Sequence, residues 1–175
     1  MSTTSPTLAA TPIVVMLRNP AMAAFLGWLI PGAGHLYQRR TAKGILFFVT
    51  ILATFFYGLY LGEGKVVYAS WRQNDTRWFY IPQLGVGLMA MPALVQAYRA
   101  PNDPTISFMA PPNLNRGGEG GDLAQWNKDL GRYFELGTIY TVIAGLLNIL
   151  AVFDALAGPV ESGDVIEKEE TPATA

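Results

Sequence analysis

The chain has 175 residues, of which 51% are hydrophobic and only 14% are charged, whereas an ordinary soluble domain has about a quarter charged residues. Its 12 Lys and Arg residues nearly balance its 13 Asp and Glu residues, so no net field favours nucleic acid as a partner. The absence of cysteine excludes disulfides, thiolate metal sites and a cysteine nucleophile.

The first 19 residues are predicted to be an N-terminal tail. They lack the positively charged start of a secretory signal, so we expect no cleaved signal peptide. Thr11 and Pro12 suit the cap and the first position of a helix, which Pro20 would end. We therefore expect a short helix through Leu17 that lies on the membrane surface.

The stretch 20–38 has no charged residue and is the first candidate span. At 1.5 Å per residue it could just cross a hydrocarbon core about 30 Å thick. Pro31 lacks a backbone donor and must bend or break the helix between Pro31 and Gly34. Broken backbone is tolerated inside a membrane only where protein or trapped water satisfies it. A broken full span and a re-entrant hairpin both remain open at this point.

Three further stretches predict transmembrane helices, which brings the expected number to about four. Residues 44–62 are free of charge and rich in Phe, Leu and Ile. Residues 78–98 are also free of charge, but two prolines predict a kinked span. Residues 134–156 give the last span, with acidic residues only near its ends. The sequence thus predicts an all-α integral membrane protein with a single transmembrane domain over residues 20–157.

Two polar segments accompany the predicted spans. Residues 122–131 begin with an acidic cap and carry apolar residues at helical spacing, which predicts an amphipathic helix on the membrane surface. Residues 158–175 are acidic and polar, so we expect a disordered tail.

Basic residues predict the orientation of the chain. Four spans would place the loop that contains Arg39, Arg40 and Lys43 on one side of the membrane and both termini on the other. Compact basic loops stay in the cytoplasm. We therefore expect this loop inside and both termini outside.

The string FLGWLIPGAGHLYQRRTAKGILFF, residues 25–48, is the most distinctive in the chain. It resembles the glycine-rich helix, tight turn and basic loop of the two-helix transmembrane domain family and of related bacterial membrane proteins with a Pro-Gly-x-Gly-His turn. The matching residues are Pro31, Gly32, Gly34, His35, Tyr37, Lys43 and Gly44. The later pieces IPQLGVGL and IYTVIAGLLNILAVFDALAGP are similar to an uncharacterised family of small bacterial membrane proteins. The resemblance implies a multi-pass protein of the bacterial inner membrane and implies no activity.

Three polar residues are candidates for a functional site. His35 is the single histidine, and a metal site around it would need carboxylate and carbonyl ligands. We expect His35 to satisfy backbone groups freed at the helix break, with a metal or haem ligand as the alternative. In the last span, Asn148 is expected to join helices through a hydrogen bond, and Asp154 to lie at the interface. No cofactor is expected.

Gly58 and Gly62 form a GxxxG pair on the second predicted span. Such a pair can let another helix approach closely. Glycine is also common in membrane helices, so chance spacing is an equal alternative.

These features predict a non-enzymatic membrane scaffold or assembly partner. Its expected partners are the lipid bilayer and a second copy or another membrane protein, and no nucleic acid. The first alternative is a small channel or transporter subunit, because many carriers expose backbone at broken helices. The second alternative is a membrane-embedded enzyme that uses His35 with Asp154, which requires the two side chains within hydrogen-bond distance.

Overall fold

A computed structural model of the chain describes residues 19–72, 75–99, 108–113 and 121–157. The regular structure of these residues is helical, apart from the two-residue antiparallel strands β1 (Trp71–Arg72) and β2 (Asp75–Thr76), whereas residues 62–70 and 108–113 form turns and irregular connections. The surface helix expected through Leu17 and the acidic tail 158–175 both lie outside the described residues.

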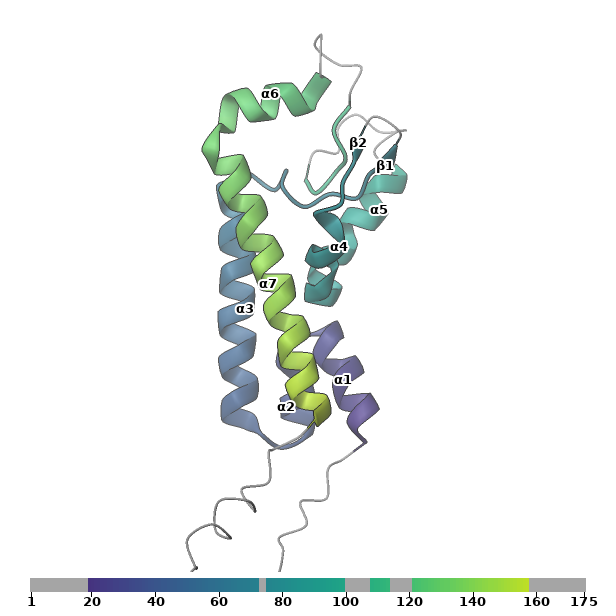
Figure 1. Cartoon of the computed structure of the whole chain (residues 1–175), viewed down its shortest axis with the longest axis vertical. Helices are drawn as coiled ribbons and strands as arrows, with labels where there is room; N and C mark the ends of the chain where they lie inside the picture. The colour runs from purple at the N-terminus through teal and green to yellow at the C-terminus, as the bar shows by residue number, and fades with distance from the viewer. Residues whose placement is uncertain (1–18, 73–74, 100–107, 114–120, 158–175) are drawn as a thin grey trace, which may run out of the picture.

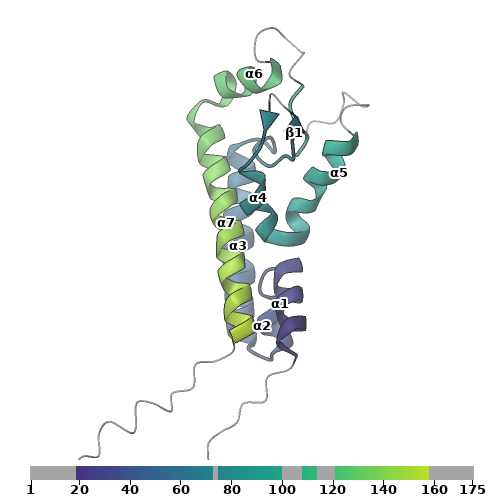
Figure 2. The ribbon, with the colours of Figure 1, turned by 45° about the vertical axis from the view of Figure 1, so that its right-hand side comes forward.

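Two long helices, α3 (Thr41–Leu61) and α7 (Arg132–Ala157), run antiparallel and side by side (Figures 1 and 2). At 1.5 Å per residue they are about 32 and 39 Å long. Both are long and apolar enough to cross a membrane, which suggests a membrane location for the chain. The helices expected over 44–62 and 134–156 are therefore present as continuous helices.

The contact between α3 and α7 depends on small residues. A Cβ atom added to Gly58 would lie 2.8 Å from the carbonyl oxygen of Gly137, and one added to Gly137 would lie 2.6 Å from that of Gly58. The two backbones can approach this closely because neither residue carries a side chain. Gly62 also belongs to this contact, because its backbone nitrogen would lie 3.1 Å from a Cβ atom added to Gly137, and its own Cα faces Val66 in the connection that follows α3.

The first apolar stretch forms a hairpin. Helix α1 (Pro20–Leu29) begins at the Asn19 cap, and α2 (Ala33–Tyr37) runs back along it to the end where α1 began (Figure 2). A Cβ atom added to Gly34 would lie 2.3 Å from the carbonyl oxygen of Ala23, so the two helices are in direct backbone contact. Of the two arrangements that the sequence left open for this stretch, the structure has the hairpin.

The third apolar stretch is also a hairpin and not a continuous span. It consists of α4 (Tyr80–Gln83), a 3-10 helix η1 (Leu84–Ala90) and α5 (Met91–Arg99), which returns to the end where α4 began (Figures 1 and 2). Gly87 has φ 69° and ψ −124°, a conformation that residues with a side chain rarely adopt. The prediction of a single kinked helix over 78–98 is wrong, because the chain reverses its direction within this stretch. The described residues thus contain two full-length helices, and four spans are not present among them.

The two hairpins start at opposite ends of the molecule and meet tip to tip beside α7 (Figure 2). A Cβ atom added to Gly87 would lie only 1.9 Å from the carbonyl oxygen of Trp28, at the tip of the first hairpin. Helix α1 is about 15 Å long, half the thickness of a hydrocarbon core of about 30 Å. The tips therefore meet about 15 Å from the end of α7 that lies beside the basic loop.

This arrangement corrects the expected orientation. The start of α1, the basic loop before α3 and the end of α7 all lie at one end of the molecule (Figure 1). The expected orientation required the first stretch to cross to the other end, and among the described residues the first hairpin does not do so.

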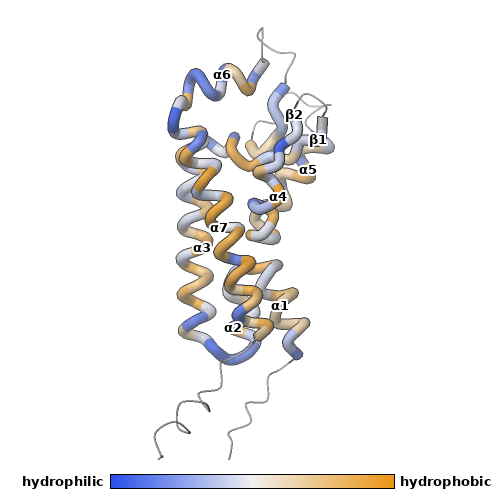
Figure 3. The backbone as a smooth tube through the Cα atoms, viewed as in Figure 1, coloured by the Kyte–Doolittle hydropathy of each residue, from blue (hydrophilic) through white to orange (hydrophobic). Residues whose placement is uncertain are grey.

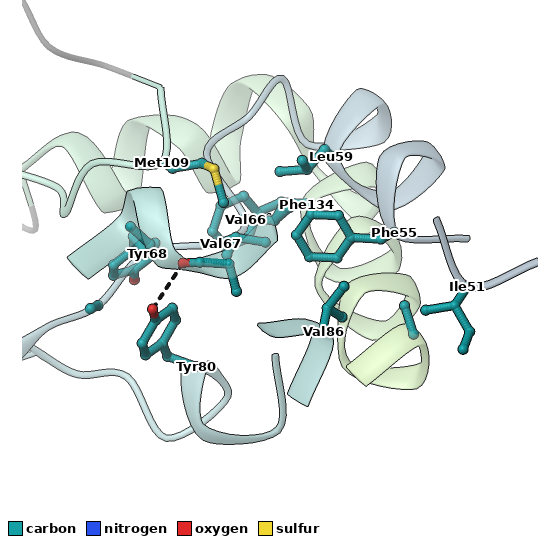
Figure 4. Packing of buried hydrophobic residues seen from close by; sticks show 14 of the residues in the cluster. Ile51, Phe55, Leu59, Val66, Val67, Tyr68, Tyr80, Val86, Met109 and Phe134 are labelled. Carbon is teal, nitrogen blue, oxygen red and sulfur yellow. Dashed lines mark hydrogen bonds between the residues drawn. The ribbon is translucent and has the colours of Figure 1, made fainter. Parts of the chain in front are cut away.

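At the opposite end, the buried connection between α3 and β1 completes the core together with the short helices. The buried cluster includes Ile51, Phe55, Leu59, Val66, Val67, Tyr68, Tyr80, Val86, Met109 and Phe134 (Figure 4). Helix α6 (Gly121–Leu130) lies across this end, and its apolar side packs on the cluster (Figure 1). Helix α6 covers all but the last residue of the stretch 122–131, for which the sequence predicts an amphipathic helix on the membrane surface. Hydrophobic residues predominate along the long helices, whereas the basic loop is hydrophilic and α6 alternates between hydrophilic and hydrophobic residues (Figure 3).

Candidate functional site

Asn148 lies on α7 where the tips of the two hairpins meet. Its side chain is fully buried. The side-chain amide donates to the carbonyl oxygens of Gly27 (3.1 Å), Trp28 (3.4 Å) and Gly85 (2.9 Å). The last four carbonyls of a helix have no partner within that helix, and the first two of these acceptors belong to the last turn of α1. Asn148 therefore caps α1 and at the same time ties it to η1.

Close backbone packing surrounds this junction. A Cβ atom added to Gly145 would lie 2.0 Å from the carbonyl oxygen of Pro82, and one added to Gly85 would lie 2.6 Å from that of Gly145. The segments of the second hairpin can reach α7 only because both positions are glycine. Small residues beside an amide are the arrangement that brings membrane helices together.

A second buried amide lies nearer the other end of α7, and sequence reasoning missed it. The Gln83 side chain is fully buried, and its amide donates to Thr141 Oγ1 (2.8 Å) and to the carbonyl oxygen of Val66 (3.2 Å). A glutamine inside a charge-free stretch is the signal that could have identified it. Its partners come from two segments far away in the sequence, so the bond itself has no local signature.

At the end that holds the basic loop, three predicted residues gather around a carboxylate oxygen of a fourth, Asp154. Lys43 Nζ lies 2.7 Å from Asp154 Oδ2. His35 Nε2 lies 3.5 Å and an Arg40 guanidinium nitrogen 3.7 Å from the same oxygen. Gln38 also donates a hydrogen bond to the carbonyl oxygen of Ala155. These contacts tie α2 and the start of α3 to the end of α7.

His35 is enclosed by protein. Its side chain is 1% exposed, and its ring centroid lies 5.0 Å from that of Phe47. The distance to Asp154 falls within the range of an ion pair, but a substrate would have to displace protein atoms to reach the imidazole. The geometry therefore suits a structural contact better than acid–base chemistry.

The remaining predicted residues shape the turn. Pro31 and Gly32 are buried, and Gly32 has φ 78°. A Cβ atom added to Gly32 would lie 2.2 Å from the carbonyl oxygen of Gly44, so the turn contacts the first turn of α3 directly. Tyr37 is half-buried, whereas Arg39 is exposed and is not among the residues that meet Asp154.

Metal binding finds no geometric support in the described part of the chain, where no three His, Asp or Glu side chains gather. The Asp154 cluster holds one carboxylate and one imidazole, together with two cationic side chains. Cations beside the carboxylate oppose the approach of a metal ion.

Arg77 is a further central residue that sequence reasoning did not single out. Its guanidinium group donates to Thr138 Oγ1 (3.0 Å) and to the carbonyl oxygen of Val66 (3.1 Å). Its Cζ atom lies 4.6 Å from the ring centroid of Tyr68 and 5.4 Å from that of Phe134. In the sequence it looks like an ordinary basic residue beside a span, because its contacts with Thr138 and Phe134 on α7 join segments that are far apart in the chain.

Comparison with known proteins gives one match. The model of a protein family described as a family of unknown function (DUF6677) matches residues 22–168. Neither a curated protein nor a solved structure matches the chain.

Proposed function

The chain belongs to this family of unknown function, DUF6677, and we propose that it is a non-enzymatic multi-pass protein of a bacterial inner membrane that serves as an assembly partner. Membership confirms the expected resemblance to an uncharacterised family. In the proposed arrangement, α3 and α7 cross the bilayer, and the two hairpins are re-entrant segments that enter it from opposite sides.

The observation that carries this proposal is the hydrogen bonding at Asn148. Non-helical backbone at membrane depth persists only where protein or water satisfies its polar groups. Asn148 binds carbonyl oxygens from both hairpin tips and is itself fully buried. A pair of half-length segments joined in this way is suited to the middle of a bilayer.

A packed junction favours assembly over transport. The glycines at 85, 87 and 145 leave room for neighbouring backbone but not for one additional carbon atom.

The outer faces of the long helices carry large exposed apolar side chains. On α3 these include Ile45, Leu46, Val49, Phe56 and Tyr60, and on α7 they include Leu146, Leu150 and Phe153. We propose that one of these faces contacts a second copy of the chain while the other contacts lipid.

Cysteine cross-linking tests this proposal, because the chain has no native thiol. Val49→Cys places a thiol on the exposed face of α3, and Leu150→Cys places one on the exposed face of α7. We expect oxidation in isolated membranes to give a covalent dimer from one position and a monomer from the other. Monomers from both positions, together with a monomeric mass in nanodiscs, would exclude self-assembly through these faces.

The second candidate is a small channel or transporter subunit. It is favoured by two acceptor atoms at the junctions, Asn148 Oδ1 and Gln83 Oε1, which are buried and accept no hydrogen bond from the described residues. Broken helices that meet at mid-membrane are also typical of carriers. Solute flux into proteoliposomes that is lost in Asn148→Leu, while the cross-linked dimer persists, would favour transport over the assembly role.

A further inference from the structure

A cavity of about 460 Å³ lies at the end of the molecule away from the basic loop, where α6 meets the first turns of α7. This volume is in the range of small-molecule sites in proteins. A polar border is formed by Arg77, by Asn127 on α6 and by Glu135 and Thr138 on α7. The cavity therefore presents one cation, one amide, one carboxylate and one hydroxyl group, and that hydroxyl accepts a hydrogen bond from Arg77.

Below this polar border the wall is apolar. Ile139, Val142 and Ile143 lie on one face of α7, since positions four, seven and eight residues after Glu135 share a helix face. Ile139 is 53% and Ile143 is 42% exposed, so this face is open to the surroundings of the helix. Phe79 completes the wall from the segment before α4. In the proposed membrane orientation, the polar border lies at the headgroup level and the apolar wall points to the hydrocarbon core.

We propose that this cavity binds one zwitterionic phospholipid with a primary amine in its headgroup. The phosphate lies near Arg77 and Asn127, the ammonium group donates to the Glu135 carboxylate, and an acyl chain lies along Ile139 and Ile143. The proposal rests on the membrane location of the chain and not on its self-assembly.

Charge complementarity determines the choice of lipid. Arg77 is held in place by its bonds to Val66 and Thr138, so its positive charge stays at the cavity. An anionic headgroup would match Arg77 but would be repelled by Glu135. A headgroup with one phosphate and one ammonium group matches both charges, and an ammonium group donates hydrogen bonds that a quaternary amine cannot.

The test uses the full chain in detergent and native mass spectrometry with phosphatidylethanolamine, phosphatidylglycerol or phosphatidylcholine. We expect one phosphatidylethanolamine to remain bound per chain after the other two lipids have dissociated. Glu135→Gln removes the carboxylate charge and should lower the preference for phosphatidylethanolamine over phosphatidylglycerol by about tenfold, the usual effect of losing one charged hydrogen bond.

A cavity-filling variant tests the position of the acyl chain. Ile139→Trp fills the apolar wall, whereas Leu150→Trp adds the same side chain to α7 outside the cavity. We expect lipid retention to be lost only in Ile139→Trp, with Ile143→Trp as the replacement if that variant does not fold. Equal retention in both tryptophan variants, or equal retention of all three lipids by the unmodified chain, would overturn the proposal. Loss of a dimer on filling the cavity would assign it to a second copy and would also overturn the proposal.

Discussion

The contact between α1 and α2 depends on the single hydrogen atom that Gly34 has in place of a side chain. An added Cβ atom would lie 2.3 Å from the carbonyl oxygen of Ala23 and 3.1 Å from the Ala155 Cβ atom. We therefore expect Gly34→Ala to lower the melting temperature in detergent and Gly34→Leu to prevent accumulation of the protein. The matched control is Gly27→Ala on α1, where the nearest atoms lie 3.5 Å away. A melting temperature for Gly34→Ala equal to that of the control would contradict the prediction.

Removal of the Asn148 amide should loosen both hairpins at once. Asn148→Leu leaves carbonyl oxygens of Gly27 and Gly85 without their side-chain donor. We expect it to lower the free energy of unfolding by on the order of 1 kcal/mol, because hydrogen bonds between membrane helices seldom contribute more. Unfolding in mixed micelles measures the difference, with Leu146→Ala on the exposed side of α7 as the control. A loss no larger than that of the control would show that the bonds contribute nothing.

Individual residues of the site were predictable to different degrees. Asn148 stands out in the sequence because an amide within an apolar span requires a partner. Its acceptors lie more than 60 positions away in each case, and no local pattern identifies them. Arg77 gave no signal for a different reason: a basic residue beside a predicted span is expected at the membrane surface whether or not aromatic rings enclose it.

Among the elements, the sequence predicted the long helices well and the hairpins poorly. Hydropathy measures the length of an apolar run, and a hairpin of two half-length segments has the same composition as one span. The proline at position 31 marked the first break but not the direction of the chain after it. In the third stretch the reversal occurs at Gly87, whose backbone conformation the two nearby prolines do not reveal.

The hairpin arrangement makes a prediction about sidedness. The basic loop at the start of α3 and the β1–β2 turn lie at opposite ends of the long helices (Figure 1). We expect Thr41→Cys to be protected from an impermeant thiol reagent in intact cells and Thr76→Cys to be labelled, because the compact basic loop should stay in the cytoplasm.

The sidedness experiment has an internal control in the termini. A tag at either terminus should report the same side as Thr41, since the start of α1 and the end of α7 lie at that end of the molecule. A tag on the side of Thr76 would show that a hairpin crosses the membrane and would contradict the fold. Labelling of Thr41 alone would keep the fold but invert its orientation.

At the scale of the whole molecule, the long helices α3 and α7 are packed more extensively than the short helices α5 and α6. Helices α3 and α7 pack along each other, whereas α5 packs chiefly on η1 and α6 chiefly on α7. Segments with few packing partners open at lower free energy than the core. We expect amides of α5 to exchange with deuterium faster than those in the middle of α3, measured in nanodiscs. Equal protection of α5 and α3 would contradict this expectation.

Synthesis on the ribosome gives the Asn148 cap a further consequence. Asn148 follows Gly27 by 121 residues, so the first hairpin emerges long before its capping side chain is made. Until then the end of α1 carries carbonyl groups that an apolar environment does not tolerate. Nascent chains that stop before α7 should therefore keep an incompletely folded hairpin that membrane proteases can cleave. The last helix to be translated would then complete the folding of the first.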